Sequence, residues 1–92
     1  MSASVRQEGD ALVFAGPLDR AAVAALWPRL RALAPPPRRF DLRAVEAVDS
    51  AGLALLAELA ERAGGAELVG TPPGLAELRA AYRLDAGLAF AG

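Results

Sequence analysis

The chain has 92 residues, 54% of them hydrophobic, and a net charge of −1, so it is long enough for one globular domain and too short for two. It contains no Cys, His or Lys, which excludes disulfides, the common zinc sites, Ser-His and Cys-His nucleophile pairs and Schiff-base chemistry. We therefore expect no catalytic, cofactor or metal site, and the near-neutral charge predicts no nucleic acid as a partner. No apolar run reaches the roughly 18 residues of a membrane span, so we expect no direct membrane insertion.

The N-terminal part predicts a strand and then a helix. Ala11–Phe14 is an apolar run between Gly-containing turns, typical of a strand, and residues near Val5 could pair with it as an antiparallel hairpin. Leu18–Leu33 predicts a helix with Asp19 near its capped N-terminus. Pro28 is expected to kink or restart this helix, because proline removes one helical hydrogen bond. The apolar residues at helical spacing are Val23, Leu26, Leu30 and Leu33.

A second strand follows the proline run. Arg39–Val45 predicts this strand, which Val48 and Asp49 could continue beyond a bend at Glu46. The residues expected to alternate toward the core are Phe40, Leu42 and Ala44.

The clearest predicted helix is Ser50–Ala63, with Asp49 or Ser50 as its N-cap and a glycine pair as its stop. Its broad apolar arc consists of Leu53, Leu55, Leu56, Leu59 and Ala60. Glu58 and Glu61 fall on the opposite face, where a solvated surface is the better interpretation than a pair of catalytic carboxylates.

The C-terminal part predicts a short strand at Glu67–Val69 and a helix that begins with Thr71 as cap and Pro72 at its first position. Gly87–Phe90 could form a final edge strand. This alternation predicts one α/β domain over residues 1–92, with a small mixed sheet of four or five strands covered by three or four helices.

The segment Val48-Asp49-Ser50-Ala51-Gly52-Leu53 resembles the signature of STAS domains, in which a strand carrying Asp-Leu, here Asp41-Leu42, leads through a turn into a helix. Gly16-Pro17-Leu18-Asp19 is similar to the start of the family's first helix, and Val69–Tyr82 to its last strand and helix. The resemblance covers nearly the whole chain. It implies the STAS (anti-sigma factor antagonist-like) fold and a non-catalytic protein that docks onto a partner.

Two groups within that family have this length. Leu26-Trp27 and Gly52–Leu56 are similar to the STAS subunit of the Mla phospholipid ABC transporter, although Ser50 stands where Thr is more usual in that group. This resemblance implies a cytoplasmic protein, peripheral to the inner membrane through its partner, that binds the transporter ATPase and supports its assembly or activity in outer-membrane lipid asymmetry. The alternative is an anti-sigma factor antagonist, which binds an anti-sigma serine kinase and is phosphorylated on the Ser at position 50.

The predicted partner-binding residues are Asp49, Ser50, Ala51, Gly52, Leu53 and Trp27. At the junction of strand and helix, free N–H groups and the helix dipole would let the fold tolerate a phosphate on Ser50. The phosphate would add roughly −1.5 to −2 charges, which would disrupt a docking face. Simpler interpretations stay open at four positions. Asp49 or Ser50 could serve only as a cap, Leu53 could belong to the core, and Trp27 could be ordinary packing.

Overall fold

The computed structural model describes residues 3–33, 36–85 and 88, which form four strands and three helices. In chain order the elements are β1 (Ser4–Glu8), β2 (Ala11–Leu18), α1 (Arg20–Leu30), β3 (Arg39–Val48), α2 (Ser50–Arg62), β4 (Glu67–Val69) and α3 (Leu75–Ala81). The predicted α/β class is confirmed, and the numbers of described strands and helices agree with the prediction. The strand predicted at Gly87–Phe90 lies outside the described residues, except for Leu88.

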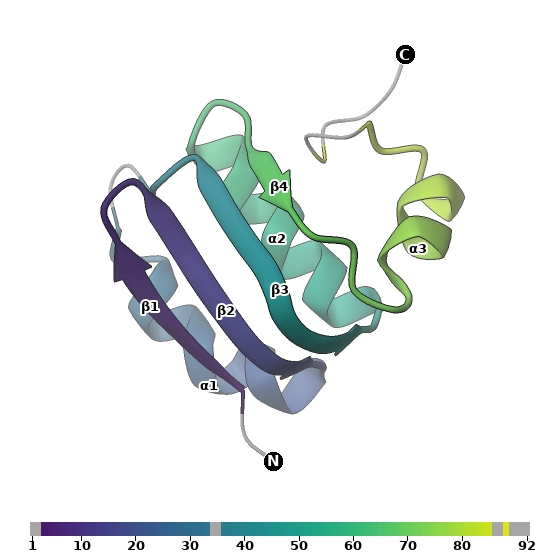
Figure 1. Ribbon diagram of the computed structural model, residues 1–92, viewed down its shortest axis with the longest axis horizontal. Helices are drawn as coiled ribbons and strands as arrows, with labels where there is room; N and C mark the ends of the chain where they lie inside the picture. Colours follow the sequence, from purple (N-terminus) through teal and green to yellow (C-terminus); the bar gives the residue numbers. More distant parts are fainter. Residues whose placement is uncertain (1–2, 34–35, 86–87, 89–92) are drawn as a thin grey trace.

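The strands form one sheet in the order β1-β2-β3-β4. β1 and β2 are antiparallel, which confirms the opening hairpin, whereas β2–β3 and β3–β4 are parallel. Each parallel pair is joined by a helix, as parallel strands require. α1 and α2 lie side by side behind the sheet in Figure 1, and α3 lies next to α2 on the β4 side. No described helix crosses the opposite face of the sheet, which we call the open face.

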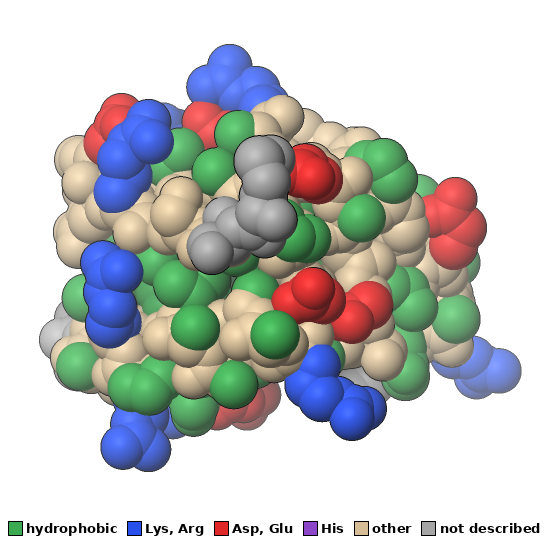
Figure 2. Space-filling model, turned by 90° about the horizontal axis from the view of Figure 1, so that it is seen from below, with side chains coloured by type: hydrophobic (Ala, Val, Ile, Leu, Met, Phe, Trp, Pro, Cys, Tyr) green, Lys and Arg blue, Asp and Glu red, His purple; other side chains and the backbone are tan. Residues whose placement is uncertain are grey.

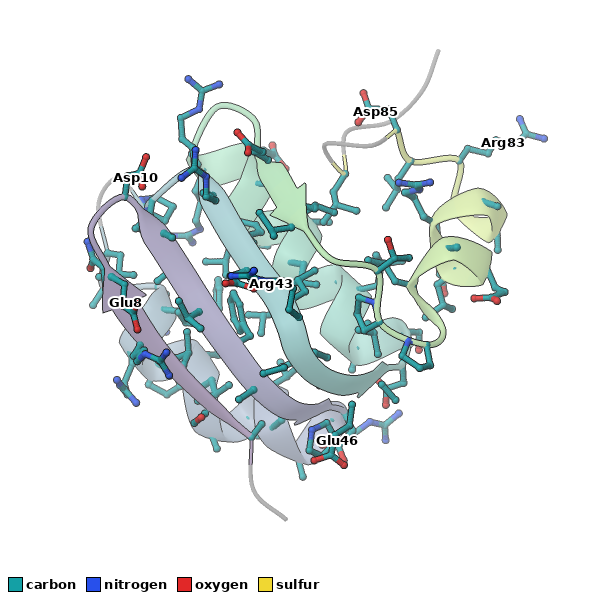
Figure 3. All side chains as sticks on the ribbon, in the orientation of Figure 1. Glu8, Asp10, Arg43, Glu46, Arg83 and Asp85 are labelled. Carbon is teal, nitrogen blue, oxygen red and sulfur yellow. The ribbon has the colours of Figure 1, made fainter. Side chains whose placement is uncertain are left out.

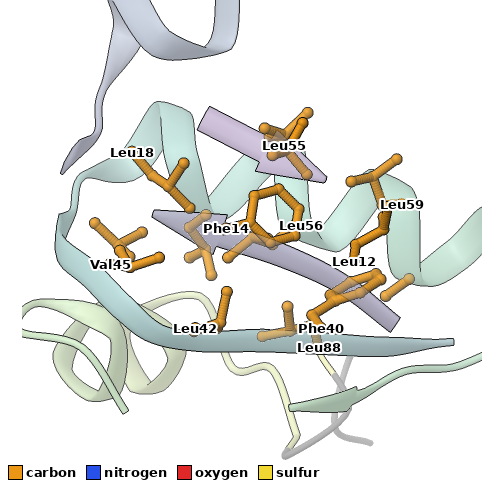
Figure 4. Close-up of a cluster of buried hydrophobic side chains, with 14 of the residues drawn as sticks. Leu12, Phe14, Leu18, Phe40, Leu42, Val45, Leu55, Leu56, Leu59 and Leu88 are labelled. Carbon is orange, nitrogen blue, oxygen red and sulfur yellow. The ribbon is translucent and has the colours of Figure 1, made fainter. Parts of the chain in front are cut away.

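The core lies between the sheet and the two helices behind it (Figure 4). Phe14 and Phe40 from neighbouring central strands are both fully buried and meet edge to face, with 6.1 Å between ring centroids. Every residue of the predicted apolar arc of α2 is buried, including the fully covered Leu56 and Leu59. Burying a Leu side chain contributes roughly 1.5–3 kcal/mol, so α2 is the main helical support of the sheet.

The predicted alternation along β3 is wrong after Leu42. Val13 pairs with Asp41 but Ala15 pairs with Ala44, and a second shift follows at Pro17, so β3 carries two bulges. The buried residues of β3 are therefore Phe40, Leu42, Val45 and Val48, and Ala44 is exposed.

Asp41 explains the first bulge. Its carboxylate accepts the backbone N–H of Arg43 at 3.1 Å and two guanidinium N–H groups at 3.0 and 2.7 Å. The Asp41 side chain therefore provides an acceptor for the Arg43 N–H within the bulge. Arg43 rises from the open face of the sheet in Figure 3. At the second shift, Pro17 has no N–H to donate to the ladder, which favours a bulge there.

The first helix is shorter than predicted. Leu18 is the last residue of β2, Asp19 is the N-cap, and the helix ends at Leu30, so Leu33 lies beyond it. Pro28 does not restart the helix, because Arg31 still donates to the Trp27 carbonyl at 2.9 Å. A proline so close to the C-terminus removes only one bond, and few bonds follow it.

The last helix begins later than predicted, at Leu75, with Gly74 rather than Thr71 before it. A tertiary bond explains the difference: the Val48 N–H donates to the Pro73 carbonyl at 3.0 Å, which holds the preceding loop against the end of β3. Gly74 turns the chain with φ of 91°, and an added Cβ would lie 2.5 Å from the Val48 carbonyl oxygen.

We expect Asp41→Asn to make the protein less sensitive to acid. Hydrogen bonds from the Arg43 guanidinium, and then from its backbone N–H, lower the pKa of Asp41 from 3.8 to about 2. A pKa lowered by folding stabilises the protein above the unfolded value, and that contribution is lost as the pH falls through about 2. Urea denaturation should therefore show a smaller loss of stability for Asp41→Asn than for the wild type between about pH 4 and pH 2.

The control for this experiment is Glu46→Gln, which removes a second carboxylate of β3, one that is exposed and makes no side-chain bond within the described chain. It should follow the wild type. If the wild type and Asp41→Asn lost the same amount of stability on acidification, the Asp41–Arg43 pair would contribute nothing to folding.

Candidate functional site

The candidate site lies where β2 and β3 end side by side. Leu18 pairs with Val48 in the last register position, and each strand passes directly into a helix. The Asp49 N–H donates to the Leu18 carbonyl at 3.2 Å, so the first turns of α1 and α2 are tied together. Sites of α/β proteins commonly lie at this carboxyl end of the strands.

α1 and α2 each have a carboxylate as N-cap. Asp19 accepts the Ala22 N–H and Asp49 accepts the Gly52 N–H, both at 2.9 Å. The sequence left Asp49 and Ser50 as alternative caps for α2, and the structure assigns this role to Asp49. Ser50 is the first residue inside the helix and is exposed, so its hydroxyl is not needed as the cap.

We expect Asp49→Ala to lower the free energy of unfolding by about 1 kcal/mol, since it leaves the Gly52 N–H in the first turn of α2 without its acceptor. Ser50→Ala removes no cap and should change stability by less than about 0.5 kcal/mol. Urea denaturation of both variants measures the difference. A larger loss for Ser50→Ala than for Asp49→Ala would overturn the cap assignment.

The five contiguous site residues divide into a surface and its support. Asp49 and Ser50 are exposed and Ala51 is half-buried, whereas Gly52 and Leu53 are buried. Leu53 is only 2% exposed and belongs to the core, so of its two interpretations the structure favours core packing over an exposed anchor. Asp49, Ser50 and Ala51 are the predicted partner-binding residues of this group that are not buried, and we call them the docking surface. Figure 2, which views the molecule from below, shows acidic and basic side chains dispersed among hydrophobic ones.

Trp27 is not brought to the docking surface. It is half-buried on α1, and the Arg62 guanidinium lies 5.2 Å from its ring centroid. Arg62 is at the other end of α2, twelve residues from Ser50, which corresponds to about 18 Å along the helix. The Arg62 Nε also donates to Glu58 at 3.2 Å. Trp27 therefore supports a charged pair on α2.

The sequence did not reveal a groove beside α2. This groove has a volume of about 710 Å³ and is lined by residues of α2 together with Tyr82, Leu84 and Leu88. We call it the α2 groove. Ser50 lines one end of it and Gly64 and Gly65 line the other. Tyr82 lies at the C-cap of α3 and is 51% exposed.

Across residues 3–33, 36–85 and 88, no three acidic side chains gather closely enough to hold a metal ion. None of the described helices is long and apolar enough to cross a membrane.

The family model described as "Mlab, STAS domain" matches residues 1–89. Thirteen chains of solved structures match, and one of them, titled "Crystal Structure Analysis of Mglu", is 25% identical with a TM-score of 0.50. That match covers 77% of this chain and 19% of the other, so this chain spans about a fifth of that protein's length. A search of curated proteins finds no match. The family model covers nearly the whole sequence, and the chain therefore belongs to the STAS domain family.

Proposed function

We propose that this chain is a non-catalytic subunit that binds the ATPase of an Mla-type phospholipid ABC transporter and supports its assembly or activity in outer-membrane lipid asymmetry. The family description, which names Mlab, supports this choice among STAS proteins. The single observation that carries it is the docking surface: Asp49 and Ser50 are exposed at the first turn of α2. The chain would then act in the cytoplasm, at the inner membrane through its partner.

The docking surface suits protein recognition because it is rigid. Asp49 is fixed by its cap bond and by the bond from its N–H to Leu18, and Gly52 and Leu53 pack directly beneath it. A preorganised surface loses little conformational entropy on binding. Since the exposed groups are small, a partner can approach the α2 backbone closely.

The alternative is an anti-sigma factor antagonist that binds a serine kinase, and the position of Ser50 favours it. The hydroxyl is exposed at the first residue of α2, where the helix dipole favours a phosphate. In this alternative, phosphorylation of Ser50 would switch docking off, because it adds roughly −1.5 to −2 charges to the surface.

A pull-down from native membranes tests the proposal. Tagged wild-type chain should recover an ABC ATPase with its permease, read by mass spectrometry, and Ser50→Arg should reduce that recovery to background. Ala24→Arg is the matched control, since Ala24 is exposed and belongs to α1 and not to the docking surface. Recovery of a serine kinase instead, lost with Ser50→Asp, would establish the alternative. Equal ATPase recovery by Ser50→Arg and wild type would place the interface elsewhere.

A further inference from the structure

β1 is an edge strand of the sheet, because it pairs with β2 alone in the order β1-β2-β3-β4. Its outer side carries no further strand within the described part of the chain, and Figure 1 shows it bordering the sheet with α1 behind it. The opposite edge strand, β4, has only three residues. Since a free strand edge presents unpaired N–H and C=O groups to other strands, β1 is the place where this sheet can be extended.

The hairpin fixes which backbone groups of β1 point outward. Glu8 pairs with Ala11 across a two-residue turn, and the two residues that close such a turn exchange both of their hydrogen bonds. Hydrogen-bonded and non-bonded pairs alternate along an antiparallel ladder. Arg6 therefore bonds to β2 as Glu8 does, whereas the N–H and C=O groups of Val5 and Gln7 point away from β2.

One of these outward groups already has a partner in the same chain. The Arg29 guanidinium, on the last turn of α1, donates to the Val5 carbonyl at 3.4 Å. Arg29 makes no ion pair across residues 3–33, 36–85 and 88, so this contact is what holds its side chain over the edge. A strand added to β1 would need the same carbonyl as an acceptor. Arg29 therefore competes directly with strand pairing at this edge.

Charge along β1 favours a second copy of this chain as the added strand. Arg6 and Glu8 are both exposed, lie on one face of the strand and form an ion pair. Antiparallel pairing of two β1 strands about Gln7 would put Arg6 of each copy opposite Glu8 of the other, and opposite charges at facing positions stabilise a sheet. Pairing about Arg6 would instead face two arginines, which is destabilising. The two-fold arrangement also closes after one addition.

The helix behind the edge suits this pairing. Two sheets joined edge to edge about a two-fold axis keep their helices on the same side, so the two α1 helices would lie next to each other. Ala25 lies one turn before Arg29 on the same face of α1 and is exposed. Its small side chain lets the second helix approach, whereas the long side chain of Arg29 occupies the edge.

We propose that the edge of β1 pairs with the same edge of a second copy of this chain, antiparallel about Gln7, and that Arg29 restrains this pairing by holding the Val5 carbonyl. Each dimer has to break the Arg29–Val5 bond in both copies, so self-association is weak while Arg29 is in place. The inference does not depend on the proposed function, because β1 contributes no residue to the docking surface.

Removing Arg29 tests the restraint. Sedimentation velocity over a concentration series measures the dimer dissociation constant of the purified chain, and circular dichroism checks that each variant is folded. We expect Arg29→Ala to lower that constant about tenfold, since two hydrogen bonds no longer have to be broken. Arg31→Ala is the matched control, because Arg31 is an exposed arginine at the C-cap of the same helix, and it should behave like the wild type. Equal dissociation constants for the two variants, or only monomers of Arg29→Ala, would overturn the proposal.

Single cysteines test the register, because the chain has no cysteine of its own. In the Arg29→Ala protein, Gln7→Cys should give a disulfide-linked dimer under mild oxidation, since facing Cα atoms of a bonded pair lie about 5.5 Å apart, within reach of a disulfide. Ala80→Cys, exposed on α3, is the control and should stay monomeric. Cross-linking of Gln7→Cys no greater than that of Ala80→Cys would mean that β1 does not pair with itself.

Charge reversal tests the same register without cysteine. In the Arg29→Ala protein, Glu8→Arg should weaken the dimer about tenfold, because it faces Arg6 of each copy with an arginine of the other. Exchanging both charges, Arg6→Glu with Glu8→Arg, should restore the dimer, since opposite charges then face each other again. A dimer that Glu8→Arg leaves unchanged, or that the double exchange does not restore, would show that pairing about Gln7 is wrong.

Discussion

Replacing Gly52 by Ala should lower the free energy of unfolding by about 3 kcal/mol or more, although Ala is normally the better helix residue by about 1 kcal/mol. The reason is the close approach of α2 to the end of β2. A Cβ at position 52 would overlap the carbonyl oxygen of Leu18 and lie 2.9 Å from the Leu18 Cβ. Both contacts involve atoms close to the backbone, which cannot rotate away.

Neighbouring structure cannot absorb the extra methyl group. Leu18 is fully buried, and its carbonyl also accepts the Asp49 N–H at 3.2 Å. Moving α2 outward would lengthen that bond and separate the apolar arc of α2 from the sheet. Urea denaturation measures the loss. Ala54→Gly on the exposed side of the same helix is the control, and it should cost only about 1 kcal/mol. A Gly52→Ala protein more stable than the wild type would contradict the close approach.

Gly52 therefore serves the docking surface from beneath. A Cβ at position 52 would point toward Leu18 in the protein interior, whereas Asp49 and Ser50 are exposed at the surface. A glycine in this motif is thus required by the chain's own packing. The partner-binding interpretation applies to the surface that Gly52 positions.

Much of the fold could be predicted because its signals are local. The strand Glu67–Val69 has the predicted bounds, and α2 begins at Ser50 as predicted. Turn residues and helical spacing mark these positions in the sequence. The start of α2 was also found locally, because the motif itself is contiguous. The sequence could not decide between Asp49 and Ser50 as the cap, since either side chain can accept the bond.

The rest depends on contacts between distant segments. α3 begins at Leu75 because Val48 at the end of β3 bonds to the Pro73 carbonyl, a contact between distant segments that no local pattern reveals. The α2 groove needs α2 and the segment after α3 to be placed relative to one another. Trp27 was predicted to be a partner contact, but its surroundings include Arg62, thirty-five residues later in the chain.

The bulges of β3 show most directly how tertiary structure overrides a local pattern. Strict alternation after Leu42 would bury Ala44 and expose Val45. One extra residue reverses this assignment, so Val45 is only 6% exposed and lies in the core (Figure 4), whereas Ala44 is exposed on β3. A bulge moves every later side chain to the other face. The bulged register therefore predicts that position 45 is the buried one and position 44 the exposed one, the opposite of strict alternation.

Val45→Asp should remove a large part of the protein's stability, whereas Ala44→Asp should cost less than about 1 kcal/mol. An Asp at position 45 would place an unpaired carboxylate in the core, because the described chain has no buried polar or charged residue to pair with it. The expected loss is about 4 kcal/mol or more, against a total stability of roughly 5–15 kcal/mol for a domain of this size. Circular dichroism with urea denaturation measures both variants. If Ala44→Asp were the more damaging of the two, strict alternation would be right and the bulged register wrong.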